Sequence, residues 1–355
     1  MKYNFDIIEQ DCELLYNKVD CTNLRNRKVL ITGANGLIGS FMADFLSFLN
    51  TKDYNIDICL TSYSDAPHAE RIQHLLANNR VKYFSWDCSQ SININLLDPE
   101  LDFIFFCSGY GQPAKFSKDN IKTSFINTVG VNSLLNCLTT INKKTNFLFL
   151  STSEIYGDPD PENIPTPETY NGNYSICSPR ASYIISKRLG EVICNDYSKN
   201  YDINVKIARV SLIYGPGVLL DDKRVLQDFI FKAKNNKIIK LLDTGESLRN
   251  YLYLTDGVEI LLNLILNENS KETTYNVGGD QEPTTILELA KKIGNFMQCK
   301  VETTDTGVRS DITVSSPKNV YLSMNKYRKE FKKDKNDFIP LDSGINQVIR
   351  WYRFN

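Results

Sequence analysis

The sequence predicts an α/β protein built on a doubly wound parallel sheet, with a smaller α/β domain toward the C-terminus. Short apolar runs alternate with longer amphipathic segments along the first 210 residues. The first apolar run leads directly into a Gly-x-x-Gly-x-x-Gly loop and then into helical periodicity. Alternation of this kind favours parallel strands joined by helical crossovers, and such sheets bind ligands beyond the carboxyl ends of their strands.

Length and composition agree with this class and exclude several others. The chain has 355 residues, 42% of them hydrophobic, which suffices for one large and one smaller domain. Lys and Arg total 41 against 42 Asp and Glu, so we expect neither a nucleic acid nor an anionic membrane as partner. Nine cysteines without Cys-x-x-Cys spacing, and two histidines, predict reduced thiols in a cytoplasmic protein that holds no metal.

The N-terminus predicts an added amphipathic helix within residues 1–27. Its apolar residues have helical spacing, and it has neither the basic region nor the apolar core of an export signal. No other segment is apolar enough to cross a membrane, because the most apolar helical candidate, Tyr251 to Leu266, contains Asp256, Glu259 and Asn263.

The remaining elements follow from the positions of the apolar runs. Strands are predicted at Val29–Thr32, Ile56–Thr61, Val81–Trp86, Phe103–Cys107, Phe147–Ser151 and Val205–Val210, and helices at residues 37–50, 119–140 and 180–199. Five prolines lie between Pro159 and Pro179, which predicts a loop that reaches the ligand site and could form part of a lid.

The glycine loop predicts a cradle for the phosphates of a dinucleotide. Gly33 permits the tight turn, Gly36 lets backbone amides approach a pyrophosphate, and Gly39 lets the helix pack closely on the strand. Three glycines can also serve the packing of any strand-turn-helix unit, so the loop alone is weak evidence.

A second signal lies about 150 residues downstream, where Tyr183 and Lys187 stand four apart on a predicted helix. This spacing places both side chains on one helix face, where a lysine ammonium lowers the pKa of a phenol and makes it a usable base. The strand before this helix ends in Ser151-Thr152-Ser153-Glu154, and the Thr152 hydroxyl can hydrogen-bond the same substrate oxygen. Alone, a Tyr-x-x-x-Lys pair would more often be a half-buried aromatic and a solvated charge. With the glycine loop it indicates a nicotinamide-dependent enzyme.

Taken together, the motifs resemble those of the extended short-chain dehydrogenases/reductases, the family of nucleotide-sugar epimerases, dehydratases and decarboxylases. The match covers about residues 28 to 352. The motifs appear in order as Thr32–Gly39, Asn127–Gly130, Ser151–Gly157, Tyr183–Lys187, Tyr214–Gly217, Arg249 with Tyr253 and Asp256, and Tyr275–Gly279. The resemblance implies a Rossmann sheet that binds NAD, a nucleotide-sugar substrate, and a homodimer.

The resemblance also implies a division of the chain and a set of cofactor contacts. Residues 1–210 and 245–275 would form the dinucleotide-binding domain, and residues 211–244 and 276–355 the nucleotide-sugar-binding domain. Gly33, Gly36 and Gly39 would hold the pyrophosphate, Asp87 would contact adenine, and Lys187 would contact the nicotinamide ribose. The complete implied cofactor set is Gly33, Asn35, Gly36, Leu37, Ile38, Ser62, Asp87, Cys88, Cys107, Ser108, Gly109, Asn127, Tyr183, Lys187 and Val210.

Within the family, Thr-Ser-Glu before Ile-Tyr-Gly, with Arg180 three residues before the tyrosine, is most similar to UDP-glucuronate decarboxylases. The implied catalytic residues are Thr152, Ser153, Glu154, Tyr183 and Lys187. Arg180 would hold the sugar carboxylate or form a structural salt bridge. Glu154 would act as an acid or base near C5 or accept a backbone hydrogen bond. Rival hypotheses are a 4-epimerase, a 4,6-dehydratase, a C4 dehydrogenase, a dinucleotide sensor without turnover, and a structural subunit.

The sequence departs from the family pattern mainly on the substrate side. Arg249 would bind a substrate phosphate, but Ser211 replaces the frequent asparagine before Tyr-Gly-Pro that contacts the substrate pyrophosphate. Leu322-Ser323 stands near the position of the usual Pro-Asp, and the segment Gly109–Ala114 beside the nicotinamide is also unlike the decarboxylases. The second strand ends in Thr61-Ser62-Tyr63-Ser64, without the acidic residue that favours NAD over NADP, so NADP stays an alternative.

Dimers of the family pack the Tyr-Lys helix and its neighbour into a four-helix bundle. The resemblance therefore implies apolar outer positions on residues 119–140 and 184–199. The candidates are Val129, Leu134, Leu138, Leu189 and Val192, although burial in the core would explain them equally well.

Overall fold

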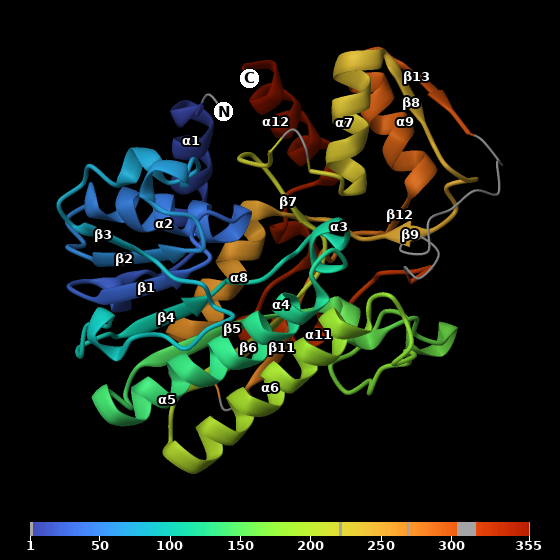
Figure 1. Cartoon of the computed structure of the whole chain (residues 1–355). Coiled ribbons are helices and arrows are strands. Elements are labelled where there is room, and N and C mark those ends of the chain that lie inside the picture. The colour runs from blue at the N-terminus through green and yellow to red at the C-terminus, as the bar shows by residue number, and fades with distance from the viewer. Residues whose placement is uncertain (1–2, 220–221, 268–269, 271, 304–316, 355) are drawn as a thin grey trace.

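The computed structural model describes residues 3–219, 222–267, 270, 272–303 and 317–354. Seven parallel strands form one sheet in the order β11-β6-β5-β4-β1-β2-β3 (Figure 1). The strands are β1 Lys28–Thr32, β2 Asp57–Ser62, β3 Val81–Ser85, β4 Phe103–Phe106, β5 Asn146–Thr152, β6 Val205–Val210 and β11 Thr274–Val277. The order runs outward from β1 in both directions, so the predicted doubly wound sheet is confirmed, and its switch point lies between β1 and β4.

Helices cover both faces of the sheet (Figure 1). One layer contains α1 Phe5–Tyr16, α2 Leu37–Asn50 and α8 Leu254–Leu266, and the other contains α4 Asn120–Phe125, α5 Val131–Ile141 and α6 Ala181–Tyr201. The central strands β1, β4 and β5 are apolar on both sides because each side is buried, whereas the edge strand β3 is partly exposed. In β4, Phe103 and Phe105 join the core beneath α2 and α8, whereas Ile104 and Phe106 join the core beneath α5 and α6.

A second group of elements lies beyond the carboxyl edge of the sheet (Figure 1). It contains α7 Val225–Asn236, β8 Ile238–Lys240, β9 Leu248–Arg249, β12 Thr284–Thr285, α9 Ile286–Met297, β13 Lys300–Glu302 and α12 Leu341–Phe354. Helix α11 Asn325–Phe331 instead packs beside β11 at the edge of the large sheet. Three two-stranded sheets join β7 Ile213–Tyr214 with β10 Leu252–Tyr253, β9 with β12, and β8 with β13. The short helix α3 Pro113–Phe116 faces this group across the sheet edge.

Three predicted helical segments differ in detail. The segment 119–140 is two α-helices around a π-helical turn at Ile126–Gly130, where a Cβ on Gly130 would lie 2.4 Å from the Cys88 carbonyl oxygen. The helix predicted from Tyr251 begins at Leu254, because Leu252 and Tyr253 pair with β7. Helix α6 begins one residue later than predicted, at Ala181. The proline-rich segment 159–179 is a loop with one 3-10 turn, as predicted.

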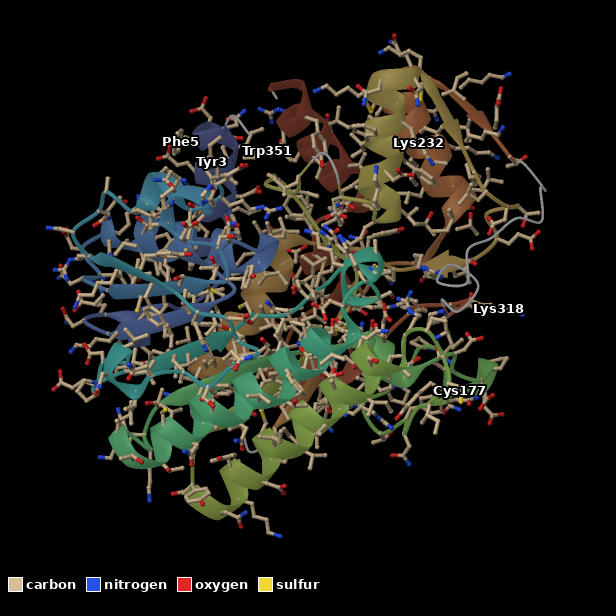
Figure 2. All side chains as sticks on the ribbon, viewed as in Figure 1. Tyr3, Phe5, Cys177, Lys232, Lys318 and Trp351 are labelled. Carbon is tan, nitrogen blue, oxygen red and sulfur yellow. The ribbon has the colours of Figure 1, made fainter. Side chains whose placement is uncertain are left out.

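The N-terminal extension is helical as predicted and packs on the sheet layer. Its apolar residues Ile7, Ile8, Cys12 and Leu15 are buried. The Lys18 ammonium lies 2.8 Å from an Asp256 carboxylate oxygen, and the Tyr253 hydroxyl donates a 2.8 Å hydrogen bond to Asp11. Figure 2 shows Tyr3 beside Trp351 of α12, with their ring centroids 5.5 Å apart. The extension therefore fastens the sheet to elements from the second half of the chain.

Among the described residues, no helix is both long enough and apolar enough to cross a membrane. All nine cysteines are free thiols. Of the predicted dimer residues, Leu134 and Leu138 are fully buried against the sheet of their own subunit and cannot belong to an outer face. Leu189 and Val192 are exposed on α6, at 48% and 51% of their surface.

Candidate active site

The glycine loop has the geometry of an anion cradle at the carboxyl end of β1. Gly33 has φ +63°, and a Cβ there would lie 2.8 Å from the backbone of Cys107 and Ser108. Gly36 is the N-cap of α2, so the first turn of this helix, with Leu37 and Ile38, presents free amides to the loop. A Cβ on Gly39 would lie 2.6 Å from the Gly33 carbonyl oxygen. The loop conformation therefore requires glycine at Gly33 and Gly39.

The other predicted cofactor residues lie along the carboxyl ends of neighbouring strands. Asn35 is held by Arg71, whose backbone amide donates to the Asn35 side chain at 3.0 Å and whose guanidinium donates to the Asn35 carbonyl at 2.7 Å. The same guanidinium donates to the Gly217 carbonyl at 2.6 Å, so Arg71 joins the glycine loop to the Tyr-Gly-Pro-Gly turn. Ser62 and Val210 end β2 and β6.

Beside β1, the ends of β3 and β4 add polar groups. The Cys88 thiol donates to the Ser108 hydroxyl at 3.1 Å, and the Ser108 amide donates to the Thr32 hydroxyl at 3.3 Å. Cys107 is the residue just after β4, half-buried behind the glycine loop. Asp87 lies 2.8 Å from the Lys122 ammonium rather than standing alone.

The pocket fits a dinucleotide. Asn127 is fully buried in the π-helical turn and donates to the Ser186 hydroxyl at 2.9 Å, but its side-chain carbonyl has no hydrogen-bond partner. A Cβ on Gly109 would lie 3.5 Å from this carbonyl oxygen and 3.4 Å from the Lys187 ammonium. The unpaired buried acceptor, the ammonium and the glycine cradle are groups that the polar atoms of a dinucleotide can bind. No cluster of His, Cys, Asp and Glu that could hold a metal occurs among the described residues.

Tyr183 and Lys187 lie on α6 as predicted, but their electrostatics differ from the prediction. The Lys187 ammonium donates a 2.6 Å hydrogen bond to the Leu150 carbonyl. Burial raises the pKa of Tyr183, and the Glu154 carboxylate raises it further, against smaller lowering effects of Thr152 and Arg180. The prediction that Lys187 lowers the pKa of Tyr183 is therefore wrong for this structure, because the ammonium bonds to β5 instead of the phenol.

Thr152, Ser153 and Glu154 come directly from the end of β5. Thr152 is the last strand residue, and its hydroxyl accepts a 3.3 Å hydrogen bond from the Glu154 amide, which begins the 3-10 turn Ser153–Tyr156. Ser153 is buried in this turn. The strand thus delivers the Thr152 hydroxyl and the Glu154 carboxylate to the neighbourhood of Tyr183.

Arg180 and Glu154, predicted separately, form an ion pair with each other. The Arg180 Nε donates to Glu154 Oε2 at 2.9 Å, and Nη2 donates to Oε1. Arg180 thus forms the salt bridge that was one of its two expected roles, and both partners lie close enough to Tyr183 to change its pKa. The Glu154 carboxylate thus binds a guanidinium rather than a backbone amide.

The other two predicted substrate residues are Arg249 and Ser211. The Arg249 guanidinium donates to the backbone carbonyls of Leu248 at 2.8 Å, Lys318 at 2.7 Å and Pro317 at 3.0 Å. Ser211 is buried, and its hydroxyl has no hydrogen-bond partner. A group that enters here can therefore bond to Ser211 without displacing a partner.

Sequence reasoning missed two residues of the pocket. Phe116 of α3 stacks face to face on the Tyr183 ring, with centroids 4.4 Å apart and 1° between the planes. Arg224, at the N-cap of α7, is paired with Asp222 at 2.8 Å and lowers the pKa of Tyr183. The segment Gly109–Ala114, which differs from the family pattern, ends two residues before Phe116. Nothing in the sequence around Arg224 signals its approach, because α7 is brought to the site by the second half of the fold.

The parallel sheet, the glycine cradle and the strand-end hydroxyls define a dinucleotide-binding protein with a reactive tyrosine. The sequence profile described as the NAD dependent epimerase/dehydratase family matches residues 29–278. The chain belongs to this family, which confirms the family predicted from the motifs, with NAD as its cofactor.

The names of individual sequence relatives agree with this family. UDP-glucuronic acid decarboxylase 1 of Xenopus tropicalis is 26% identical over 352 residues, which cover 98% of this chain and 77% of that protein. UDP-glucuronic acid decarboxylase 1 of Arabidopsis thaliana is 30% identical over 266 residues, which cover 75% of this chain and 57% of that protein. The match thus spans little more than half of the plant relative.

Solved structures share the fold at low identity. UDP-N-acetylglucosamine 4-epimerase from Methanobrevibacter ruminantium superposes with a TM-score of 0.77 at 18% identity, covering 93% of this chain and 99% of that one. UDP-glucuronic acid 4-epimerase from Bacillus cereus, solved with UDP-glucuronic acid and NAD, has a TM-score of 0.73 at 20% identity, covering 92% and 99%.

Proposed function

We propose that the protein is an NAD-dependent enzyme that oxidises C4 of a nucleotide-activated sugar, and that it decarboxylates UDP-glucuronate or a close relative. The observation that carries this proposal is the grouping of Thr152, Glu154, Arg180 and Tyr183 at the carboxyl end of β5. The names of the sequence relatives support the decarboxylase reaction in particular.

In this proposal the Tyr183 phenolate takes the proton of the C4 hydroxyl, and the Thr152 hydroxyl donates a hydrogen bond to the same oxygen. When bound, NAD would supply the hydride chemistry at C4 and a cationic ring that favours the phenolate. Oxidation at C4 turns the sugar into a β-keto acid, so the bond between C5 and C6 breaks with loss of carbon dioxide and C5 gains a proton. Glu154 is placed to handle a proton near C5, and Lys187 orients the nicotinamide ribose.

Epimerisation, 4,6-dehydration and simple C4 oxidation use the same tyrosine and are the alternatives. Arg180 favours decarboxylation, because a buried guanidinium beside the reactive tyrosine suits a sugar that carries a carboxylate. A dinucleotide sensor without turnover is the least favoured alternative, since Thr152, Tyr183 and Lys187 lie together.

Mass spectrometry tests the proposal. The purified protein is denatured and the released dinucleotide identified, and UDP-glucuronate is then offered with NAD. Release of NAD and loss of carbon dioxide from the sugar would support the decarboxylase. Loss of water or of two hydrogens from another nucleotide sugar would transfer the enzyme to the dehydratases or oxidases. Bound cofactor without turnover of any sugar would favour the sensor.

Replacing the proposed base gives the first residue prediction. Tyr183→Phe removes the phenol oxygen but keeps the ring stacked on Phe116, so we expect the dinucleotide to stay bound while kcat falls by about 10²-fold or more. Turnover of UDP-glucuronate and the dinucleotide content are measured on the same preparation. Tyr197→Phe, on the outer part of α6, is the control. Full activity of Tyr183→Phe would remove Tyr183 from the mechanism.

The domain roles belong to the same proposal. Residues 1–210 and 245–275 would bind the dinucleotide, and β11 extends the sheet of this domain to Val277. Residues 211–244 and 276–355 would bind the nucleotide sugar. The residue roles given above for Ser62, Asp87, Asn127, Ser211 and Arg249 are part of it too. A cytoplasmic location is also part of the proposal, and nine free thiols support it.

We also propose a homodimer that packs through α4 and α6. Ile121 and Phe125 of α4 and Ile185, Leu189 and Val192 of α6 are exposed apolar residues on adjacent helices. A contiguous apolar patch of this kind is typical of a protein interface. Leu189→Glu should therefore shift the protein from dimer to monomer in light scattering after size exclusion. Leu242→Glu, which changes a leucine that is 56% exposed just after β8, should not. A monomeric wild type would contradict the dimer.

A further inference from the structure

One feature of the pocket bears on how a uronic acid sugar is distinguished from a neutral hexose, and the inference rests on the proposed function. We propose that Glu154 is an internal substitute for the substrate carboxylate on Arg180. An incoming uronate displaces Glu154 from the guanidinium, and this exchange releases the Glu154 carboxylate into the reactive site.

The hydrogen-bond geometry is that of a carboxylate receptor. The Arg180 guanidinium donates from Nε to one Glu154 oxygen at 2.9 Å and from Nη2 to the other. This two-pronged arrangement is the one that arginine forms with any carboxylate of the right orientation. The C6 carboxylate of a uronic acid has the same two oxygens and the same charge, so it can occupy the place of the Glu154 carboxylate.

Glu154 is the more exposed member of the ion pair. The Arg180 side chain is only 4% exposed, whereas the Glu154 side chain is 23% exposed. Glu154 also lines a small cavity of about 20 Å³, together with Ser153, Tyr156 and Tyr321. Its carboxylate therefore has adjacent space into which to turn when another carboxylate arrives.

Two aromatic rings fix the receptor relative to the reactive tyrosine. The Arg180 guanidinium lies over the Phe116 ring, with its central carbon 5.1 Å from the ring centroid. Phe116 in turn stacks on Tyr183 at 4.4 Å. Arg180, Phe116 and Tyr183 thus form one stack, and a carboxylate held by Arg180 is held at a set place relative to the phenol.

Displacement of Glu154 from Arg180 would make the sugar carboxylate a requirement for completing the site. The Glu154 carboxylate balances the charge of the buried Arg180 guanidinium, and the carboxylate of a uronate can balance it in the same way. A hexose with a neutral hydroxymethyl group offers no replacement, and Glu154 then stays on Arg180. A uronate keeps Arg180 paired throughout and frees Glu154 beside C5. The substrate carboxylate is in this way both the group that is lost and the signal that completes the site.

Binding measurements on the NAD-loaded full chain test the exchange. The dissociation constants of UDP-glucuronate and UDP-glucose are measured by calorimetry for the wild type, Glu154→Gln and Arg180→Gln. Glutamine fills the space of Glu154 and still accepts a hydrogen bond, but it competes poorly with an anion. Glu154→Gln should bind UDP-glucuronate about fivefold to tenfold more tightly with little change for UDP-glucose, whereas Arg180→Gln should weaken UDP-glucuronate alone by about tenfold or more.

The chain offers a matched control in a second buried Arg–Glu pair beside the same strand. Arg209 and Glu191 lie 2.8 Å apart, and Glu191 also binds the Ser151 hydroxyl. Glu191→Gln makes the same chemical change and should leave the ratio of the two dissociation constants unaltered. Thermal unfolding of each variant verifies that it is folded, and a variant that is not folded is replaced by Glu154→Asp, which shortens the reach to Arg180 and should tighten UDP-glucuronate in the same direction.

The outcomes separate the two proposals. If the wild type decarboxylates UDP-glucuronate but Glu154→Gln leaves the binding ratio unchanged or weakens both ligands equally, the exchange is wrong and the proposed function stands. If the wild type binds UDP-glucuronate without releasing carbon dioxide, the proposed reaction is wrong, and a ratio shifted by Glu154→Gln still supports the exchange. A wild type that binds no UDP-glucuronate would overturn both.

Discussion

Burial governs the charge of Lys187. The side chain is almost completely enclosed beneath β5, and its ammonium bonds to a backbone carbonyl rather than to a carboxylate. Burial lowers the pKa of Lys187 to about 8, against weaker opposing effects of Cys107, Cys194 and Glu191. The same lysine in the unfolded chain keeps its proton to about pH 10.4. Between these two values the unfolded chain binds more protons, so this group makes the folded protein more stable as the pH rises.

A lysine replacement tests this pH dependence. Lys187→Met keeps the chain length and removes the charge. We expect the free energy of unfolding of the wild type, taken relative to this variant, to rise between about pH 8 and pH 10.4, by up to about 3 kcal/mol. Urea unfolding of both proteins across this range measures the difference. Lys199→Met, at an exposed position of the same helix, should give a flat difference. A flat difference for Lys187→Met would show that its ammonium is solvated.

At this scale the sequence predicts which residues meet but not how they pair. Thr152 and Tyr183 come together because a strand end and the next helix must meet at the carboxyl edge of the sheet. The direction of the Lys187 ammonium depends on side-chain torsions beneath β5, which spacing along a helix does not determine. Glu154 and Arg180 are 26 residues apart in the chain, and their pairing results from the course of the proline-rich loop.

At the scale of elements, the glycine loop is governed by close contacts. Helix α2 approaches β1 so closely that the Gly39 α-carbon faces the Gly33 carbonyl. Gly39→Ala would place a methyl group 2.6 Å from that oxygen, and backbone atoms cannot move aside easily. We expect the variant to lose the bound dinucleotide and about 1–3 kcal/mol of unfolding free energy.

The dinucleotide content after purification and a denaturant titration measure the two effects. Gly111→Ala is the matched control, because nothing lies within 4 Å of the Cβ that it would add. Equal dinucleotide content in Gly39→Ala and the wild type would show that the loop relaxes around the methyl group.

Element boundaries follow from the sequence where apolar runs are continuous. Each of the six predicted strands overlaps a strand of the sheet. In the central strands β1, β4 and β5, residues buried on both faces form an apolar run that polar residues end. The π-helical turn at Ile126–Gly130 was not predicted, since one extra residue within a turn hardly changes the periodicity of apolar residues. The predicted strands do not include β11 Thr274–Val277, whose residues enter the sequence analysis only through the family motif Tyr275–Gly279.

At the scale of the whole molecule, the N-terminal helix carries a pH-sensitive contact. Asp11 is buried between α1 and β10 and accepts the Tyr253 hydroxyl. Burial raises the pKa of Asp11 to about 7, despite that hydrogen bond. An aspartate in the unfolded chain titrates near pH 3.9. The folded protein therefore binds more protons between these values, and Asp11 makes it less stable as the pH rises through this range.

Asp11→Asn keeps an acceptor for Tyr253 and removes the charge. Its unfolding temperature should match that of the wild type near pH 4, rise above it as the pH approaches 7, and keep that advantage at higher pH. Thermal unfolding across this range measures the difference. Asp6→Asn, exposed on the same helix, is the control. Parallel pH profiles for Asp11→Asn and the wild type would show that Asp11 is not buried in its charged form.

The path of the chain has a consequence for how substrate preference can change. After β6 the chain builds α7 and β8, returns to the sheet as α8 and β11, and leaves again for β12, α9 and β13. The second group of elements, beyond the carboxyl edge of the sheet, is thus assembled from two separate stretches of sequence. Recombination between relatives cannot exchange this group as one contiguous segment, because a single exchanged segment would contain only part of it. New specificities in this architecture must arise by point substitution, or by two recombination events whose junctions both preserve the packing of α8.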